Sequence, residues 1–242
     1  MARPTMFDEA MSGAERQRRY RERHRKRLAK ERRTARKAAK PNAKALARQK
    51  REAEWAGRVL ALPDRRYGIL FADPGWRYEP WSRQTGMDRA ADNHYFCPPL
   101  DEIMRLDVQS ISAKDAVLFL CATAPMLPDA LTVMTAWGFA YKTHAIWVKQ
   151  RPGNGRGTGY WFTGEHELLL VGTRGKVVPP AMGTQARSVF TAPVGRHSEK
   201  PEVFYEMIER HWPNTPKIEL NRRGPPRPGW DAWGFEAEPT AA

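Results

Sequence analysis

The chain has 242 residues and a net charge of +14, from 41 Lys and Arg against 27 Asp and Glu. Its two cysteines, Cys97 and Cys121, form no Cys-x-x-Cys pair, which argues against a disulfide framework or a zinc ribbon and fits a reducing cytoplasm. No apolar stretch approaches the ~20 residues that span a bilayer, and no apolar segment follows the first charges, so we expect neither a membrane span nor a signal peptide.

The positive charge is concentrated at the N-terminus. Residues 1–58 hold 20 Lys and Arg and 7 Asp and Glu, a net charge of +13, whereas residues 59–242 hold 21 and 20, a net charge of +1. The sequence therefore predicts a basic arm over 1–58 and one globular domain over 59–242, which ends in a short disordered tail. Such an arm favours a polyanionic partner, with nucleic acid first.

The arm favours a helix over residues 13–40, because Arg, Lys, Ala and Glu are good helix formers and Ser12 suits the N-cap. Pro41 should interrupt this helix, and residues 43–56 suit a second one. The arm has almost no large apolar side chains, so it has no face to bury against a core or a membrane. Both a solvated, partly disordered tail and a helix that forms along phosphates fit this composition.

From Tyr67 onward, apolar strand patterns alternate with helix patterns. Strands are predicted at 67–73, 116–122, 141–149, 165–172, 188–192 and 217–220, and helices at 100–106, 127–137 and 202–212. Gly138 stands where a helix C′ glycine belongs, and the Gly-rich stretch 151–159 must be a loop. This order predicts an α/β fold: a mostly parallel sheet with helices on both faces.

The first strand is followed directly by Asp73-Pro74-Gly75-Trp76. Ligands of open parallel sheets bind at the carboxyl ends of strands. There, the Asp73 carboxylate and the Pro74 carbonyl would accept hydrogen bonds from an amino group on a flat ring, and Trp76 would offer a face for stacking. Two acceptors would also stabilise charge that develops on that nitrogen. Taken alone, the four residues fit an ordinary strand-ending turn somewhat better.

The wider sequence changes that balance, because residues 67–236, about 70% of the chain, resemble the MT-A seventy family of N(6)-adenine methyltransferases. The matching segments follow the family's order and spacing: ILFADPGWRYE, NHY, LDEIMRLDV, AVLFLCAT, WGFAYKTHAIWVK, GYWF, EHELLLVGTRGK, HSEKPEVFYEMIER, PKIEL and RPGWDAWG. The resemblance implies a Rossmann-like methyltransferase fold with the catalytic motif early and the cofactor strand late. It also implies S-adenosylmethionine as the cofactor and no metal.

The resemblance implies roles for individual residues. Asp73, Pro74, Gly75 and Trp76 take the place of the catalytic motif, with Asp73 also at the cofactor, and Tyr95 falls on a tyrosine near the target base. The implied cofactor contacts are Lys200 at the methionine carboxylate, Glu219 and Arg223 at and after the last strand, and Glu236 at the ribose.

Three positions depart from the family pattern. Gly75 replaces a second proline, Cys121 stands where Trp is usual, and Phe235 replaces an Asn after the final Trp-Gly. These changes leave room for a weak or specialised enzyme, or for a scaffold that keeps the fold without the reaction. The presence of Asp73 and Lys200 argues against the scaffold.

The loop that begins at residue 151 is not a dinucleotide fingerprint, because Thr158 stands in place of the third glycine and no helix follows. A mobile substrate loop and a plain flexible connection fit it about equally. In the first interpretation Arg151 and Arg156 lie near phosphates, and Tyr160 and Trp161 anchor the end of the loop. Lys149, before it, fits either a phosphate contact or a surface lysine. His166 is interpreted as a structural histidine.

We therefore expect an enzyme that methylates the exocyclic amino group of adenine in DNA, with or without sequence specificity. RNA is the weaker alternative as substrate. The target is single-stranded or flipped out of a duplex, because a stacked base cannot enter a pocket at a sheet edge.

Overall fold

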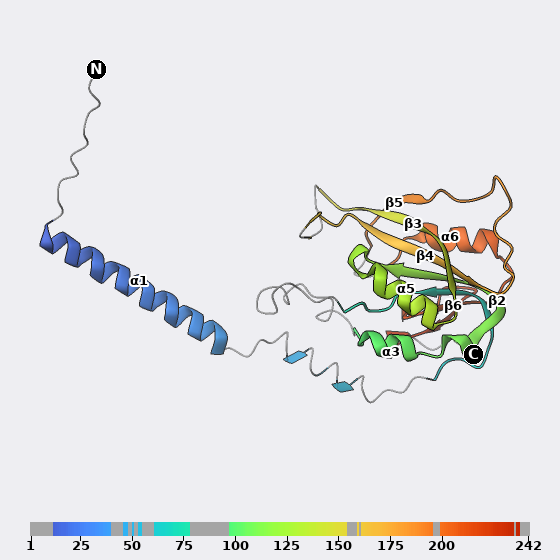
Figure 1. Ribbon diagram of the computed structural model, residues 1–242, viewed down its shortest axis with the longest axis horizontal. Coiled ribbons are helices and arrows are strands. Elements are labelled where there is room, and N and C mark those ends of the chain that lie inside the picture. Colours follow the sequence, from blue (N-terminus) through green and yellow to red (C-terminus); the bar gives the residue numbers. More distant parts are fainter. Residues whose placement is uncertain are drawn as a thin grey trace, which may run out of the picture. The chain divides into compact units, whose positions relative to one another are not determined.

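The computed structural model describes residues 12–39, 46–47, 50, 53–54, 61–77, 97–153, 159, 161–195, 199–234 and 236–237 (Figure 1). Contacts within the chain divide it into two units, Met1–Ala47 and Arg48–Ala242. No helix in these described residues is long and apolar enough to cross a membrane.

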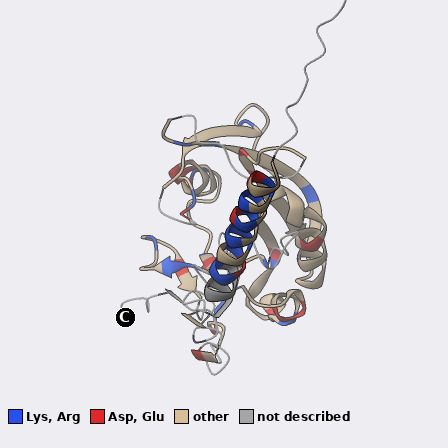
Figure 2. Cartoon of the chain, turned by 90° about the vertical axis from the view of Figure 1, so that its left-hand side faces the viewer, with Lys and Arg blue, Asp and Glu red and all other residues tan. Residues whose placement is uncertain are grey.

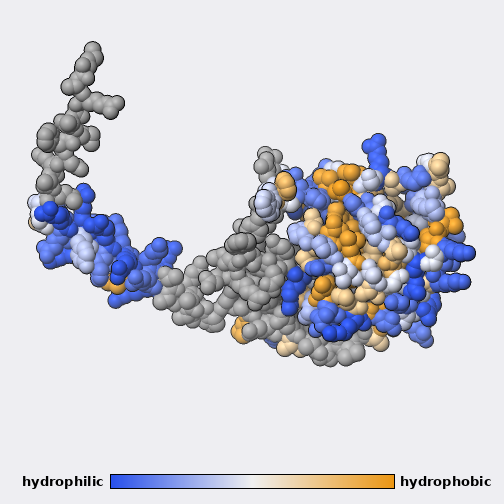
Figure 3. Space-filling model, viewed as in Figure 1, coloured by the Kyte–Doolittle hydropathy of each residue, from blue (hydrophilic) through white to orange (hydrophobic). Residues whose placement is uncertain are grey.

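The first unit contains one long helix, α1 (Gly13–Ala39), as the sequence predicts. Ser12 and Glu15 form a capping box: Ser12 Oγ accepts from the amide of Glu15, and the Glu15 carboxylate accepts from the amide of Ser12. All residues of α1 whose exposure is described are exposed. Lys and Arg line the helix (Figure 2), and its surface is mostly hydrophilic (Figure 3). Over residues 13–33 the helix therefore has no buried face, and its stability there rests on local interactions.

The second unit is built on a seven-stranded sheet with the strand order β5-β3-β4-β2-β1-β6-β8. The neighbouring pairs are parallel except for the two that involve β4, so the sheet is mostly parallel. In chain order, its elements are β1 (Tyr67–Ala72), α3 (Leu100–Arg105), α4 (Val108–Ile111), β2 (Ser112–Ala122), η3 (Ala124–Met126), α5 (Leu127–Ala136), β3 (Ala140–Gln150), β4 (His166–Arg174), β5 (Val189–Pro193), α6 (Glu202–His211), β6 (Lys217–Leu220) and β8 (Asp231–Trp233). A separate pair, β7 (Arg223–Gly224) and β9 (Glu236–Ala237), is also parallel.

Alternating residues of the central strand β1 enter two cores, one on each face of the sheet. Leu70 and Ala72 pack in the core that includes side chains of α3, α4 and α5. Ile69 and Phe71 pack in the other core, with side chains of α6. The sheet is thus covered by helices on both faces, which confirms the predicted Rossmann-like architecture.

The strands and helices predicted from residue 67 onward and the helix predicted at 13–40 are present, with ends that shift by a few residues. The second arm helix predicted over 43–56 lies largely outside the described residues. Gly138 has φ +80° after α5, as expected of a C′ glycine. The strand predicted at 116–122 begins earlier, at Ser112, and the short elements α4, η3, β7, β8 and β9 were not predicted.

The antiparallel strand β4 determines which residues meet at the functional edge of the sheet. Its first residues pair with the last residues of β2, since Leu168 lies opposite Ala122. They also pair with the end of β3, where His166 lies opposite Val148. The carboxyl ends of β1, β2, β3, β5 and β6 and the amino end of β4 therefore lie along one edge.

Candidate active site

The Asp-Pro-Gly-Trp turn leaves the carboxyl end of β1 and is held on both sides. The amide of Asp73 donates to the carbonyl of Leu220 at the end of β6, at 3.3 Å. The indole N–H of Trp76 donates to the carbonyl of Cys121 in β2, at 2.9 Å. Trp76 is buried, so the ring expected to stack on a base is largely covered, and its visible task is to fix the turn.

Four charged side chains from four segments meet beside this turn. Nζ of Lys200, in the segment before α6, lies 2.7 Å from Oδ2 of Asp73 and 3.5 Å from Oε2 of Glu167 in β4. The other oxygen of Glu167 accepts a hydrogen bond from Nζ of Lys149 at the end of β3, at 2.5 Å. Two carboxylates and two ammonium groups thus alternate in one chain of ion pairs, with a formal charge of zero.

Lys200 is the most buried member of this chain, with a side chain only 5% exposed. Burial by itself would lower the pKa of the Lys200 ammonium, but Asp73 and Glu167 raise it well above its ordinary value. Burial likewise opposes ionisation of Glu167, and the ammonium groups of Lys200 and Lys149 more than offset it, so the pKa of Glu167 is lowered. Lys200 and Glu167 are therefore both charged at neutral pH.

One acceptor in the cluster is incompletely used. Oε2 of Glu167 is buried and has no hydrogen-bond partner among the described residues, although the Lys200 ammonium lies within ion-pair distance. A buried carboxylate oxygen without a donor is costly, and such an atom at a sheet edge suits a donor from a bound molecule.

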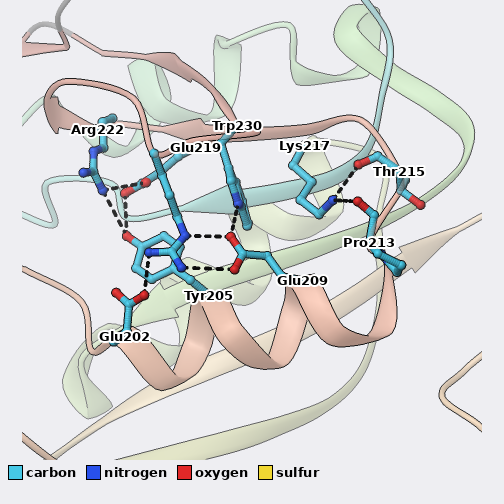
Figure 4. Close-up of polar contacts among 10 residues, drawn as sticks. Glu202, Tyr205, Glu209, Pro213, Thr215, Lys217, Glu219, Arg222 and Trp230 are labelled. Atoms are coloured by element: carbon cyan, nitrogen blue, oxygen red, sulfur yellow. Dashed lines mark hydrogen bonds and ion pairs between the residues drawn. The ribbon is translucent and has the colours of Figure 1, made fainter.

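A second polar cluster surrounds Glu219 in β6 (Figure 4). Its carboxylate accepts from the hydroxyl of Tyr205, at 3.0 Å, and from the guanidinium of Arg222, at 2.9 Å. Burial is the main cause that raises the pKa of Glu219, and the nearby Asp73 charge adds to it. Next to it, Arg227 binds both oxygens of Glu209, at 2.6 and 3.0 Å, which ties the segment after β7 to α6.

The two late candidates for the cofactor site, Arg223 and Glu236, are brought together by backbone pairing. They lie opposite each other in the parallel pair β7–β9. Arg222, rather than Arg223, is the residue that pairs with Glu219. The chain turns sharply here, with φ +65° at Asn221 and +75° at Gly224.

The substrate-loop candidates have different outcomes. Lys149 is neither a free phosphate ligand nor a surface lysine here, because Glu167 and the Trp147 ring, 4.9 Å away, engage its ammonium. Arg151 donates to the carbonyl of Gly164 at 3.3 Å, at the base of the loop. Trp161 is 93% exposed, so it does not anchor the loop by packing as expected. Tyr95, Arg156, Tyr160 and Phe235 lie outside the described residues.

Glu167, Tyr205 and Arg222 were not identified from the sequence. For Glu167 the sequence does contain a signal, because an acidic residue stands directly before three leucines of a buried strand. Among the described residues, no group of three His, Cys, Asp or Glu is arranged to hold a metal ion.

Comparison with known proteins identifies the family to which this chain belongs. A sequence model of the MT-A70 family matches residues 67–236, which contain every member of the two clusters. The chain is 34% identical over 190 residues to the type II methyltransferase M.MunI from a Mycoplasma species, covering 72% of this chain and 79% of the relative. It is 30% identical over 178 residues to the human N(6)-adenosine-methyltransferase catalytic subunit METTL3, and over 161 residues to an MT-A70-like N(6)-adenosine-methyltransferase of Arabidopsis thaliana. These matches cover 72% and 65% of this chain but only 28% and 22% of the two relatives. The chain belongs to the MT-A70 family of N(6)-adenine methyltransferases.

Proposed function

We propose that this protein transfers a methyl group from S-adenosylmethionine to the exocyclic amino group of adenine in DNA. The observation that carries the proposal is the Asp73 carboxylate, which is held at the carboxyl end of the central strand and lies 2.7 Å from the buried ammonium of Lys200. The family supports methyl transfer to adenine, and the choice of DNA rests on further arguments below.

The Asp73 carboxylate and the Pro74 carbonyl each accept a hydrogen bond from the amino group of adenine. This orients the nitrogen lone pair away from both acceptors and toward the methyl donor. The C–N bond would form as the S–CH3 bond of the donor breaks and leaves a neutral thioether, and the Asp73 carboxylate would stabilise the positive charge that develops on the adenine nitrogen. The proton that the methylated nitrogen sheds passes to solvent, so the chemistry requires no strong base.

Lys200 forms an ion pair with Asp73 and fixes the position of its carboxylate. The Lys200 ammonium is positioned by an ion pair with Glu167, and Glu167 is positioned by an ion pair with Lys149. A carboxylate whose oxygen is already positioned loses little entropy when a base binds, which is the advantage of a preorganised site. Tyr95 and Trp76 are our candidates for residues that border the adenine.

The residues fit S-adenosylmethionine, which supplies an electrophilic methyl group when bound. Lys200 offers a buried ammonium for the carboxylate of its amino-acid part, and the unbonded Oε2 of Glu167 suits an ammonium donor. Glu219, Arg223 and Glu236, at and after the last parallel strand, are proposed to hold the remainder of the cofactor.

Two arguments favour DNA as the substrate class. The bacterial relative M.MunI matches over most of its own length, whereas the matches to the two N(6)-adenosine-methyltransferases cover about a quarter of each. The exposed basic helix α1 suits non-specific contact with a phosphate backbone, which many DNA-modifying proteins need. Cys97 and Cys121 are both buried and not joined in a disulfide, which suits a reaction in the cytoplasm.

Incubation of the purified protein with radiolabelled S-adenosylmethionine and either DNA or RNA, followed by nucleoside analysis, tests this function. We expect label in N6-methyladenine released from DNA. Label only in RNA would make RNA the substrate. Absence of label from both, with no cofactor binding by calorimetry, would indicate a nucleic-acid-binding scaffold, for which the departures at Gly75 and Phe235 are the supporting observations.

A further inference from the structure

The connection between β3 and β4 ends in a turn that presents two aromatic side chains to solvent. Trp161 is 93% exposed and Phe162 is 86% exposed, although they are neighbours in the chain. Single exposed apolar residues are common, but two large aromatic rings side by side on a surface indicate an interaction site. Neither ring contributes to the two cores of the sheet.

Hydrogen bonds hold the base of this turn in place. The amide of Lys149 donates to the carbonyl of Glu165 at 2.8 Å, and Arg151 binds the carbonyl of Gly164, so both strands of its base are fastened. Shortly before the two aromatic residues, a Cβ on Gly159 would lie 1.9 Å from the carbonyl oxygen of Phe162. Only glycine permits this close approach between residue 159 and the backbone of Phe162, and the approach restricts the conformation of the segment that carries the two aromatic residues.

The turn also lies at the edge of the sheet that carries the candidate active site. It joins the end of β3 to the start of β4, where Val148 lies opposite His166. Glu167, five residues after Phe162, is one ion pair away from Lys200 and two from Asp73. Five residues span at most about 18 Å, so the aromatic pair is within reach of the bases beside a nucleotide held at Asp73.

The chemistry of the loop favours nucleic acid over an apolar protein surface. Residues 151–164 contain two arginines and no acidic residue, and Gly, Tyr, Trp and Phe make up most of the remainder. Arginines bind the phosphates of nucleic acid, and exposed aromatic rings stack on bases of any sequence.

We propose that Trp161 and Phe162 form a wedge that enters the base stack of duplex DNA beside the target adenine. This inference rests on the proposed function, since a paired adenine must leave the stack before Asp73 can bind its amino group. Aromatic rings inserted into the vacated space replace the lost stacking and slow the return of the base. The wedge therefore serves extrusion of the base and has no part in methyl transfer itself.

The test compares methylation of one DNA strand when it is paired and when it is single, with the full chain. The double variant Trp161→Ala/Phe162→Ala should lose at least tenfold in rate on the duplex and change less than about twofold on the single strand, because a single strand needs no extrusion. The conservative variant Trp161→Phe/Phe162→Tyr should keep most of the duplex activity. Val178→Ala/Met182→Ala is the matched control, because these residues are 82% and 96% exposed but lie outside the loop.

Equal rates of the double variant and the wild type on the duplex would overturn the wedge, as would an equal loss on both substrates. A shift of the double variant to a smaller oligomer with unchanged methylation would assign the pair to a protein interface instead. A wild-type protein that methylates single strands only would overturn the wedge and leave the proposed function standing. A wild-type protein with no activity on any nucleic acid would overturn the proposed function itself.

Discussion

Lys200 shares one buried ammonium between Asp73, 2.7 Å away, and Glu167, 3.5 Å away. Asp73 follows the central strand and Glu167 opens an antiparallel strand two positions along the sheet, so the lysine joins distant parts of the chain. A change to any one of the three removes one charge from this chain of ion pairs and leaves each neighbouring charge with one partner fewer. Each therefore tests a different property: chemistry at Asp73, cofactor affinity at Lys200, and stability against pH at Glu167.

Asp73→Asn should lower the methylation rate by at least ~100-fold, because an amide cannot stabilise positive charge on the adenine nitrogen as a carboxylate does. Single-turnover kinetics with bound cofactor would measure the chemical step directly. Asp101→Asn is the matched control, since Asp101 is an exposed acid on α3 that pairs with Arg105. Unchanged turnover in Asp73→Asn would contradict the mechanism.

Lys200→Met should weaken binding of S-adenosylmethionine by ~10-fold or more, since the cofactor carboxylate would lose a charged partner in a buried place. Calorimetry measures this affinity in the absence of nucleic acid. Lys142→Met, at an exposed position of β3, should leave it unchanged. The cofactor must bind elsewhere if Lys200→Met and Glu219→Gln both keep the wild-type affinity.

Glu167→Gln should lower the free energy of unfolding at pH 7 by about 1–3 kcal/mol, because both lysines lose a charged acceptor. The pKa of Glu167 is lower in the folded protein than its ordinary value of 4.5. Its stabilising contribution is thus complete above that value and is lost as the pH falls through the lower folded-state pKa. Wild type and variant should then converge in acid.

Urea unfolding of both proteins from pH 7 to pH 3 would measure this difference. Glu206→Gln, on an exposed position of α6, provides the control and should behave as the wild type. A constant difference between Glu167→Gln and the wild type at every pH would mean that packing, rather than charge, accounts for the loss.

Periodicity and composition predicted the elements of this fold better than the contacts between them. The Ser12–Glu15 capping box, the helix that ends before Gly138 and the strand before Asp73 depend on residues that are close in the sequence. The direction of β4 does not, because a buried strand has the same apolar pattern in either direction. The antiparallel pairing of β4 brings Glu167 to the edge at which Lys200 lies, so this contact could not be predicted from the sequence.

The contact between Arg222 and Glu219 was likewise not predicted from the sequence. Asn221 has a left-handed conformation, and the Arg222 guanidinium donates to the Glu219 carboxylate at 2.9 Å. A left-handed residue other than glycine is uncommon, so the sequence does not indicate the path of the chain after Glu219. The role of Arg223 in the cofactor site stays a prediction.

Gly75→Pro should leave the protein folded and hold or raise its methylation rate. Gly75 is not among the described glycines with positive φ, so the sign of φ that proline requires is compatible with this turn. Proline would also restrict the unfolded chain, which stabilises by about 0.4–1 kcal/mol at a compatible position. Thermal unfolding and the methylation rate together measure both effects. Loss of folding would show that the Asp-Pro-Gly-Trp turn has a backbone closed to proline.

Removal of residues 1–57 should weaken binding to DNA and flatten its salt dependence, while cofactor affinity stays unchanged. Residues 1–58 carry +13 of the net charge of +14, so the remaining chain attracts phosphates weakly at long range. Each phosphate neutralised on duplex DNA contributes about −0.9 to the slope of log affinity against log salt. If about six basic residues of the arm contact phosphates, affinity should fall by ~10³ between 50 and 200 mM salt.

A variant that keeps α1 but removes charge separates electrostatics from any other role of the arm. Gln has nearly the helix propensity of Arg, so changing Arg18, Arg19, Arg21, Arg25 and Arg32 to Gln should preserve the exposed helix. If all five contact phosphates, the magnitude of the salt slope should fall by about 4.5 in fluorescence-anisotropy titrations, since each contact contributes ~0.9. If the truncated protein binds DNA with the affinity and salt slope of the full chain, the charge of the arm contributes nothing to DNA binding. That result would instead favour a protein partner for the arm.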